Sequence, residues 1–340
     1  MSPHRPARPD RRTLLLAAIC LTLAACAGGP PEPKPWVETA TRELGLALAS
    51  FEVQGRRVNV TRSAHAPAAT PVVVYLPGLG QGSDAGQRWA TAWAQAGYTV
   101  LAVQPLEADA AAWRSELSRT GEFRELGLLH YGDALRADRL AALRRLLPAM
   151  QAAQPALDWR RAALAGYDTG AQTALDSRGD AGWQAVLAIS PPAMQAPAHG
   201  APTLVITSEV DQDPLGLLRS PGERRQAFDT LAPGSGWLLM LGAVSHAALA
   251  GTLAPEGWHG QDQHRGPAGM GGGLGGGMGG GRGEGHARGP AGGGARGPRS
   301  GSATEAAQSD LGSGLSLSTT FLAAQLGGQP LPAGTQLLPR

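Results

Sequence analysis

Thiols are almost missing from this chain of 340 residues, which has two cysteines, Cys20 and Cys26. Both lie near its start, so the chain beyond residue 26 has no thiol and no disulfide. Aromatic residues are also few, at 5%, but a hydrophobic content of 42% is enough for a sizeable core. Stability must therefore come from that core alone.

An excess of charge of one sign is missing as well, because 29 Lys and Arg stand against 27 Asp and Glu. Four of the basic residues precede Thr13: Arg5, Arg8, Arg11 and Arg12. The rest of the chain is not basic enough to bind nucleic acid. We therefore exclude a nucleic-acid partner. No two of the eight histidines have the spacing of metal ligands. We expect no metal and no other cofactor.

The longest apolar run near the start, residues 14–23, is too short to span a bilayer comfortably. It follows a basic segment, and the two together predict a signal peptide over residues 1–26. The run ends in Leu23-Ala24-Ala25-Cys26, which resembles a bacterial lipobox. The resemblance implies that Cys26 becomes the lipid-modified first residue of an exported protein. Ala27 follows where an Asp would favour the inner membrane, so we expect anchoring to the outer membrane, facing the periplasm.

Glycine (49) and proline (27) are abundant, but much of the excess is local. Residues 27–40 are typical of a Pro/Gly-rich tether. Residues 262–303 are rich in glycine, cannot bury a core and should be disordered. An amphipathic helix pattern resumes at residues 315–326. We therefore predict one domain over residues 41–330 that contains a disordered insert, not two domains.

Strand and helix patterns alternate along this domain. Residues 46–53 and 56–61 are typical of a hairpin with a turn at Gln54-Gly55. Short apolar runs predict buried strands at residues 71–76, 98–103, 162–165, 183–190, 202–208 and 236–241. Helical patterns lie at residues 86–96, in pieces over 110–130, at 132–153 with leucines inward and Arg and Asp outward, and near 222–231. The alternation predicts a mostly parallel sheet with helices on both faces.

The most informative stretch is Gly166-Tyr167-Asp168-Thr169-Gly170, between an apolar run and a helical segment. It has the pattern G-x-Nu-x-G of a nucleophile elbow, where a strand turns sharply into a helix and presents its central residue on a strained backbone. The two glycines are needed where strand and helix pass closely. Asp168 stands where most such elbows carry Ser.

The leading hairpin and the elbow in mid-chain resemble the α/β-hydrolase superfamily. That resemblance implies an α/β-hydrolase fold whose nucleophile, acid and histidine follow different strands in that order. Asp168, Asp211 and His246 stand at the matching places, with Glu209 and Asp213 as alternatives for the acid. We expect three other histidines to lie in loops: His65, His130 and His199. Only residues 191–201 separate two of the strands, so no cap domain is expected and the site should be open to water.

The loop Pro77-Gly78-Leu79 resembles the oxyanion loop of cutinases and polyester hydrolases and, more loosely, that of dienelactone-hydrolase-like lipoproteins. The resemblance implies that the backbone N–H groups of Leu79 and Thr169 stabilise an oxyanion.

An aspartate at the elbow suits attack on an alkyl carbon, because attack on a carbonyl would give a reactive anhydride. Haloalkane dehalogenases and epoxide hydrolases use Asp in this way, but they have a His-Gly-x-Pro loop and a cap domain that this chain lacks. We predict a hydrolase of a small or exposed ester-type substrate, with Asp168 as nucleophile or base and His246 activating water. Two alternatives stay open: an inactive binding or scaffold lipoprotein of the same fold, and a hydrolase whose nucleophile is Ser245 or Thr169.

Overall fold

The computed structural model describes residues 35–252 and 300–340. The expected signal peptide with Cys26, most of the tether and most of the Gly-rich insert lie outside the described residues. Helix α2 (Pro35–Arg42) covers the end of the expected tether, and α11 (Ser300–Gly327) begins before the expected end of the insert. Within the described parts, no helix is both long and apolar enough to cross a membrane.

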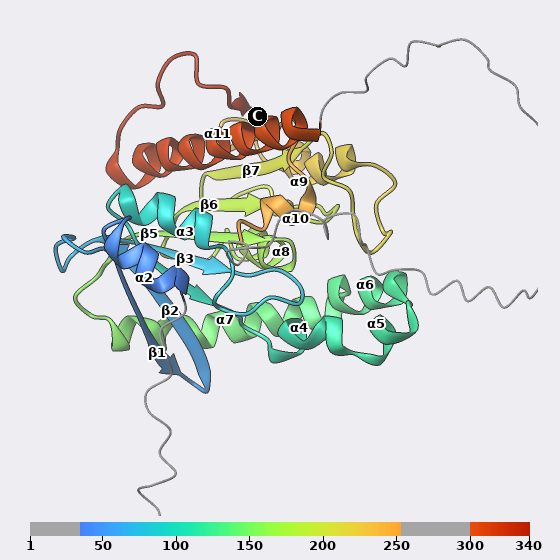
Figure 1. Ribbon diagram of the computed structural model, residues 1–340, viewed down its shortest axis with the longest axis horizontal. Coiled ribbons are helices and arrows are strands. Elements are labelled where there is room, and N and C mark those ends of the chain that lie inside the picture. Colours follow the sequence, from blue (N-terminus) through green and yellow to red (C-terminus); the bar gives the residue numbers. More distant parts are fainter. Residues whose placement is uncertain (1–34, 253–299) are drawn as a thin grey trace, which may run out of the picture.

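A nine-stranded sheet in the order β1-β2-β4-β3-β5-β6-β7-β8-β9 forms the centre of the molecule (Figure 1). The strands are β1 (Leu46–Val53), β2 (Arg56–Ser63), β3 (Pro71–Leu76), β4 (Thr99–Val103), β5 (Asp158–Tyr167), β6 (Trp183–Ile189), β7 (Thr203–Ser208), β8 (Gly236–Leu241) and β9 (Leu338–Pro339). The six strands from β3 to β8 are parallel to one another, while β1, β2 and β9 pair antiparallel. The predicted α/β-hydrolase fold is confirmed.

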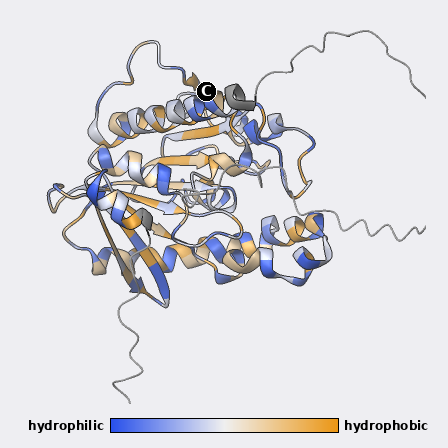
Figure 2. Cartoon of the chain, in the orientation of Figure 1, coloured by the Kyte–Doolittle hydropathy of each residue, from blue (hydrophilic) through white to orange (hydrophobic). Residues whose placement is uncertain are grey.

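Helices cover both faces of this sheet, because side chains alternate between the faces along each strand. On one face, Trp93 and Phe321 pack against Val73 and Tyr75 of β3. On the other face, leucines of α7 (Asp133–Ala153) pack against Val72 and Val74 of the same strand. The helices besides α2 and α11 are α3 (Gln87–Gln95), α4 (Glu107–Ala111), the 3-10 turn η1 (Ala112–Arg114), α5 (Glu116–Thr120), α6 (Phe123–Tyr131), α7 (Asp133–Ala153), α8 (Thr169–Asp176), η2 (Pro221–Arg225), α9 (Gln226–Thr230) and α10 (His246–Leu249). Figure 2 shows hydrophilic and hydrophobic residues mixed along α7, whose buried side chains include Leu143, Leu146 and Met150.

The hairpin turn is where the sequence places it. Gln54 and Gly55 have φ angles of 50° and 72°. Positive φ at both central residues is the two-residue turn that matches the twist of paired strands. The short strand β9 was not predicted, because two residues carry no periodic pattern.

The segment from α4 to α7 differs from expectation in the polar side chains that it buries. His130, expected in a loop, lies in α6 and is 4% exposed, and Arg139, on the face of α7 expected to be outward, is 1% exposed. Both contact Asp109 of α4, with His130 Nδ1 2.7 Å and Arg139 Nη1 3.3 Å from its Oδ1. Their burial was missed because it depends on hydrogen bonds to a carboxylate that is distant in the sequence.

Candidate active site

Asp168 occupies the bend between β5 and α8, at φ 55° and ψ −116°. Positive φ is strained for a residue with a side chain. The flanking glycines are required by close approach: an added Cβ at Gly170 would lie 2.1 Å from the carbonyl oxygen of Leu76, and one at Gly166 would lie 2.2 Å from that of Gly170. The sequence pattern and the backbone geometry therefore agree on a nucleophile elbow.

Both oxygens of the Asp168 carboxylate accept hydrogen bonds. Oδ2 accepts from the backbone N–H of Leu79 at 3.1 Å, and Oδ1 accepts from the hydroxyl of Tyr131. The N–H of Leu79, expected to face a substrate oxyanion, thus faces the carboxylate of the elbow residue itself. Asp168 is only 3% exposed, so its carboxylate is held largely away from bulk water. Tyr131, from α6, takes part in covering it.

The loop that presents the Leu79 N–H is fixed from several sides. The N–H of Gly80 donates to the carbonyl of Asp109 at 2.7 Å. The indole N–H of Trp113 donates to the carbonyl of Leu79 at 3.2 Å, and the amide of Gln104 donates to that of Gly78 at 3.3 Å. These bonds hold the peptide groups of the loop in place, so the Leu79 N–H is oriented before any ligand arrives.

Tyr131 is a site residue that the sequence reasoning missed. Its carbonyl accepts from the amide of Gln172 at 3.2 Å, and Gln172 in turn accepts from the buried Arg139. Burial, together with the charge of Asp168 and their hydrogen bond, raises the pKa of Tyr131 well above its usual value. The phenol therefore stays protonated and acts as a donor. Nothing in its local sequence distinguishes it from a core tyrosine.

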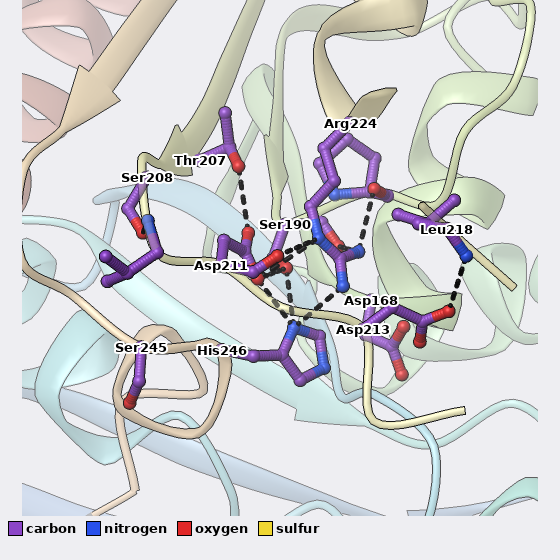
Figure 3. Close-up of polar contacts among 12 residues, drawn as sticks. Asp168, Ser190, Thr207, Ser208, Asp211, Asp213, Leu218, Arg224, Ser245 and His246 are labelled. Atoms are coloured by element: carbon purple, nitrogen blue, oxygen red, sulfur yellow. Dashed lines mark hydrogen bonds and ion pairs between the residues drawn. The ribbon is translucent and has the colours of Figure 1, made fainter. Parts of the chain in front are cut away.

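Asp211, which is buried, and His246, which is partly exposed, form a pair at the same edge of the sheet, after β7 and β8 (Figure 3). The Nδ1 of His246 lies 2.9 Å from Asp211 Oδ1. The hydroxyl of Ser190 lies 2.8 Å from His246 Nδ1 and donates to Asp211 Oδ1 at 2.9 Å. The hydroxyl of Thr207 donates to Asp211 Oδ2 at 2.8 Å. These donors hold the Asp211 carboxylate in one position, and the carboxylate in turn orients the imidazole of His246.

The two alternatives for the acid are placed differently. Asp213 accepts backbone N–H bonds from Leu215 and Leu218, both at 3.0 Å, and so stabilises its own loop. Glu209 is exposed. Of the three candidates, Asp211 is the one hydrogen-bonded to His246.

Arg224 of η2 is a second missed residue, 2% exposed and in contact with this pair. Its Nε lies 3.1 Å from Asp211 Oδ1, and its Nη2 lies 3.2 Å from His246 Nδ1. Burial acts to raise the pKa of Asp211, but the hydrogen bond from His246 and the charge of Arg224 outweigh it, so the pKa is lowered. In the sequence Arg224 stands among other charged residues and looks like part of a solvated surface.

Asp168 and His246 are brought to the same edge of the sheet, but within the described chain no hydrogen bond joins them. They are linked through Tyr167, which precedes Asp168. The Tyr167 ring lies 5.1 Å from the His246 ring, centre to centre, and its hydroxyl donates to the carbonyl of His246 at 2.9 Å.

The two alternative nucleophiles, Ser245 and Thr169, are not placed at the tip of the elbow. Ser245 is exposed, and its hydroxyl accepts from the N–H of Ala248 at 3.3 Å as the cap of α10. The hydroxyl of Thr169 is buried and, within the described residues, has no hydrogen-bond partner. Among the described residues, neither hydroxyl is hydrogen-bonded to the His246 ring. The role of the Thr169 N–H as an oxyanion donor stays a prediction.

A cavity of about 400 Å³ adjoins the site and shares Tyr131, Gln172 and Arg224 with it. Apolar side chains, including Met194 and Leu217, form part of its wall. This size lies within the range of small-molecule sites. A second cavity, of about 280 Å³, lies against α7 and shares no residue with the site. Across the described residues, no group of three or more His, Cys, Asp or Glu is placed to hold a metal ion.

No family model matches the chain, and no curated protein matches it. Among solved structures, the chain is similar to a dienelactone hydrolase from Anabaena variabilis, with 21% sequence identity and a TM-score of 0.40. The match covers 60% of this chain and 88% of that chain. At this identity and TM-score the likeness carries no argument about the reaction.

Proposed function

We propose that this protein is a hydrolase of an ester or a related bond, in which Asp168 attacks a saturated carbon of the substrate. In the second step His246, oriented by Asp211, activates the water that releases the product. The observation that carries this proposal is the hydrogen bond from the Leu79 N–H to Asp168 Oδ2 at 3.1 Å.

This hydrogen bond suits a covalent intermediate on Asp168. Once Oδ1 has bonded to a substrate carbon, Oδ2 is the carbonyl oxygen of the resulting ester. Attack by water on Cγ of Asp168 then places negative charge on Oδ2, where the Leu79 N–H is already aimed. Ordinary acyl transfer needs that N–H free for the substrate's oxygen, whereas here the carboxylate of Asp168 engages it.

His246 has the surroundings of a general base. Its Nδ1 faces Asp211, which leaves Nε2 as the nitrogen that takes a proton from water. Asp211 orients the ring and stabilises the imidazolium that forms. Arg224 balances the charge of Asp211, so this buried carboxylate keeps a cation beside it when the imidazole is neutral.

The test is to trap the intermediate. His246→Gln removes the base, so the first step should proceed and the second should stop. After incubation with an alkyl bromide or a terminal epoxide, intact-protein mass spectrometry should show one added substrate group, which peptide mapping places on Asp168. The control His246→Gln with Asp168→Asn should show none. No adduct in the first variant, or an equal adduct in the control, would sink the proposal.

A binding or scaffold protein that has kept the fold is the second candidate. It is favoured by the lack of a hydrogen bond between Asp168 and His246 in the described chain. Asp168→Ser discriminates between the two. If it gains activity towards short-chain nitrophenyl esters, the Leu79 N–H and His246 are aligned for catalysis. No gain, together with no trapped adduct, would support a binding protein.

Export and lipid anchoring at Cys26 complete the proposal and rest on the lipobox alone. In a bacterial host, the protein should sediment with outer membranes and incorporate labelled palmitate. Cys26→Ala should abolish both. Labelling that persists in this variant would contradict the assignment of Cys26.

A further inference from the structure

We infer that Ser190 is a positioning residue: its hydroxyl keeps the proton of the His246 ring on Nδ1, so that Nε2 stays free to take a proton from water. Ser190 directly follows β6, which lies beside β5 in the sheet. It is fully buried, and its hydroxyl contacts both His246 and Asp211. The consequence for the reaction rests on the proposed function, in which His246 is the base, whereas the position of the proton can be measured without turnover.

The backbone of Ser190 is strained. Its φ angle is 50°, a value that residues with a side chain seldom adopt. Two other described residues with a side chain have a positive φ, Gln54 in the hairpin turn and Asp168 at the elbow, and neither setting applies to Ser190. Its N–H donates to the carbonyl of Ile206 at 2.7 Å, and its carbonyl accepts from Arg224 at 3.2 Å. Strain that the surrounding structure imposes in this way is typical of functional sites.

Three atoms that share protons lie close together at this position. Ser190 Oγ is 2.8 Å from His246 Nδ1 and 2.9 Å from Asp211 Oδ1, and Nδ1 and Oδ1 are 2.9 Å apart. An ionised carboxylate can only accept, so the Ser190 hydroxyl directs its proton to Asp211 and turns a lone pair to Nδ1. Nδ1 therefore meets two acceptors. With the ring proton on Nδ1 the three contacts share two protons, but with that proton on Nε2 they would share only one.

Arg224 acts in the opposite direction. Its Nη2 lies 3.2 Å from His246 Nδ1. A guanidinium group donates and never accepts, so this contact favours a ring whose Nδ1 is unprotonated. Without Ser190, one acceptor, Asp211, would oppose one donor, Arg224. The hydroxyl of Ser190 adds the second acceptor and so holds the proton on Nδ1.

The second step of the reaction depends on this choice of tautomer. A ring with its proton on Nδ1 has a lone pair on Nε2, which can take the proton of the attacking water. The imidazolium that results keeps both acceptors at Nδ1. A ring with its proton on Nε2 cannot act as the base there. Loss of the Ser190 hydroxyl should therefore slow the second step and leave the first step, the attack by Asp168, unchanged.

The position of the proton is read by nitrogen-15 NMR of the protein labelled on histidine, because protonated and unprotonated ring nitrogens differ in chemical shift. The signals of His246 are those that His246→Gln removes. At a pH at which the ring is neutral, the wild type should carry the proton on Nδ1. Ser190→Ala should move the population towards Nε2, by about two- to tenfold in the ratio of the two tautomers, as for one ordinary hydrogen bond.

The rates of the two steps give a second readout. In the His246→Gln background, Ser190→Ala should leave the rate of adduct formation with the alkyl bromide unchanged. With His246 intact, hydrolysis of the adduct in a single turnover should be about tenfold slower than in the wild type, because the imidazolium loses one of its two acceptors. Unchanged hydrolysis would overturn the inference, and so would equal slowing of both steps, which indicates a merely structural role.

Two further variants separate the hydroxyl from the backbone. Ser190→Gly relieves the strain at φ 50° but also lacks the hydroxyl, so it should behave like Ser190→Ala in both readouts. Ser177→Ala is the matched control, because it removes another fully buried serine hydroxyl, which donates to the carbonyl of Ala174 at 3.3 Å. It should leave the signals of His246 and both rates as in the wild type.

The outcomes distinguish this inference from the proposed function. A wild-type ring with its proton on Nε2 would overturn the inference, as would a wild-type tautomer ratio in Ser190→Ala or Ser190→Gly. The same shift in Ser177→Ala would overturn it too. If His246→Gln forms no adduct, the proposed function fails, but the nitrogen-15 signals still decide whether Ser190 holds the proton on Nδ1.

Discussion

A few buried charges decide how the site is held together. Asp211 is fully buried, yet it lies within hydrogen-bond distance of His246, Arg224, Ser190 and Thr207. Removing water from a carboxylate costs several kcal/mol, which such partners must offset. The arrangement is therefore sensitive to the loss of any one charge.

Arg224→Met should destabilise the protein by about 3–5 kcal/mol, because it leaves the charge of Asp211 buried without its cation. Urea unfolding followed by circular dichroism measures this. The neighbouring Arg225→Met is the control: its pair with Asp229 is exposed, so the change should stay below about 1 kcal/mol. Similar losses in both variants would show that the burial of Arg224 is not what matters.

The lowered pKa of Asp211 makes its contribution depend on pH. A carboxylate with a lower pKa in the folded than in the unfolded state stabilises the fold above its usual value, here 3.8, and this stabilisation is lost as the pH falls. The difference in unfolding free energy between wild type and Asp211→Asn should thus be constant near neutral pH and shrink below 3.8. Urea titrations at a series of pH values measure it. A difference that grows on acidification would contradict the lowered pKa.

Among the elements, the turn from β5 to α8 presents Asp168 to its partners. Strand and helix come so close that a methyl group at Gly166 or Gly170 has no room. The sequence pattern was enough to locate this turn, because only glycine fits there. It could not show that Leu79 and Tyr131 meet Asp168, since those contacts depend on how other segments fold over the bend.

Gly170→Ala should destabilise the fold by at least about 1–3 kcal/mol, since its Cβ would lie 2.1 Å from the carbonyl oxygen of Leu76. Thermal unfolding measures the loss. Gly312→Ala in α11 is the matched control: nothing lies within 4 Å of its added Cβ, so it should stabilise the helix, by up to about 1 kcal/mol. An unchanged unfolding temperature for Gly170→Ala would mean that the elbow can open to admit the added methyl group.

Over the whole molecule, the last helix completes the site from the far end of the chain. In Figure 1, α11 lies along the sheet on the side of α3. The indole N–H of Trp93 donates to the hydroxyl of Ser318 at 3.0 Å, and Asp310 accepts from the N–H of Ala243 at 2.8 Å. Ala243 belongs to the loop that leads to His246. The helix therefore supports the base as well as the core.

Asp310→Ala should lower turnover by about tenfold, because a small displacement of a catalytic group is costly. The unfolding free energy should change by only about 1 kcal/mol, as for one ordinary hydrogen bond. Steady-state kinetics with the best substrate of the trapping series, beside urea unfolding, separates the two effects. Turnover equal to wild type would show that this anchor does not position His246.

The sequence was enough to predict a mostly parallel sheet, the alternation of strands and helices along the chain and the elbow, because these follow from periodicity and from glycines that only one geometry explains. The sequence also identified Asp211 and His246 as candidates, because they follow the strands β7 and β8. Arg224, Tyr131 and the cluster around Asp109 were beyond its reach. Their burial depends on partners far away in the chain, and charged or aromatic residues in helices are usually solvated or structural.

Whether Asp168 forms a bond to the substrate is tested most directly by isotope labelling. Repeated turnover in water enriched in oxygen-18, followed by mass spectrometry of the peptide that contains Asp168, reads out the carboxylate oxygens. If Asp168 is the nucleophile, water attacks its Cγ and the peptide gains oxygen-18 with successive turnovers. An unlabelled Asp168 peptide beside a labelled product would mean that water attacks the substrate directly, and would contradict the proposed reaction.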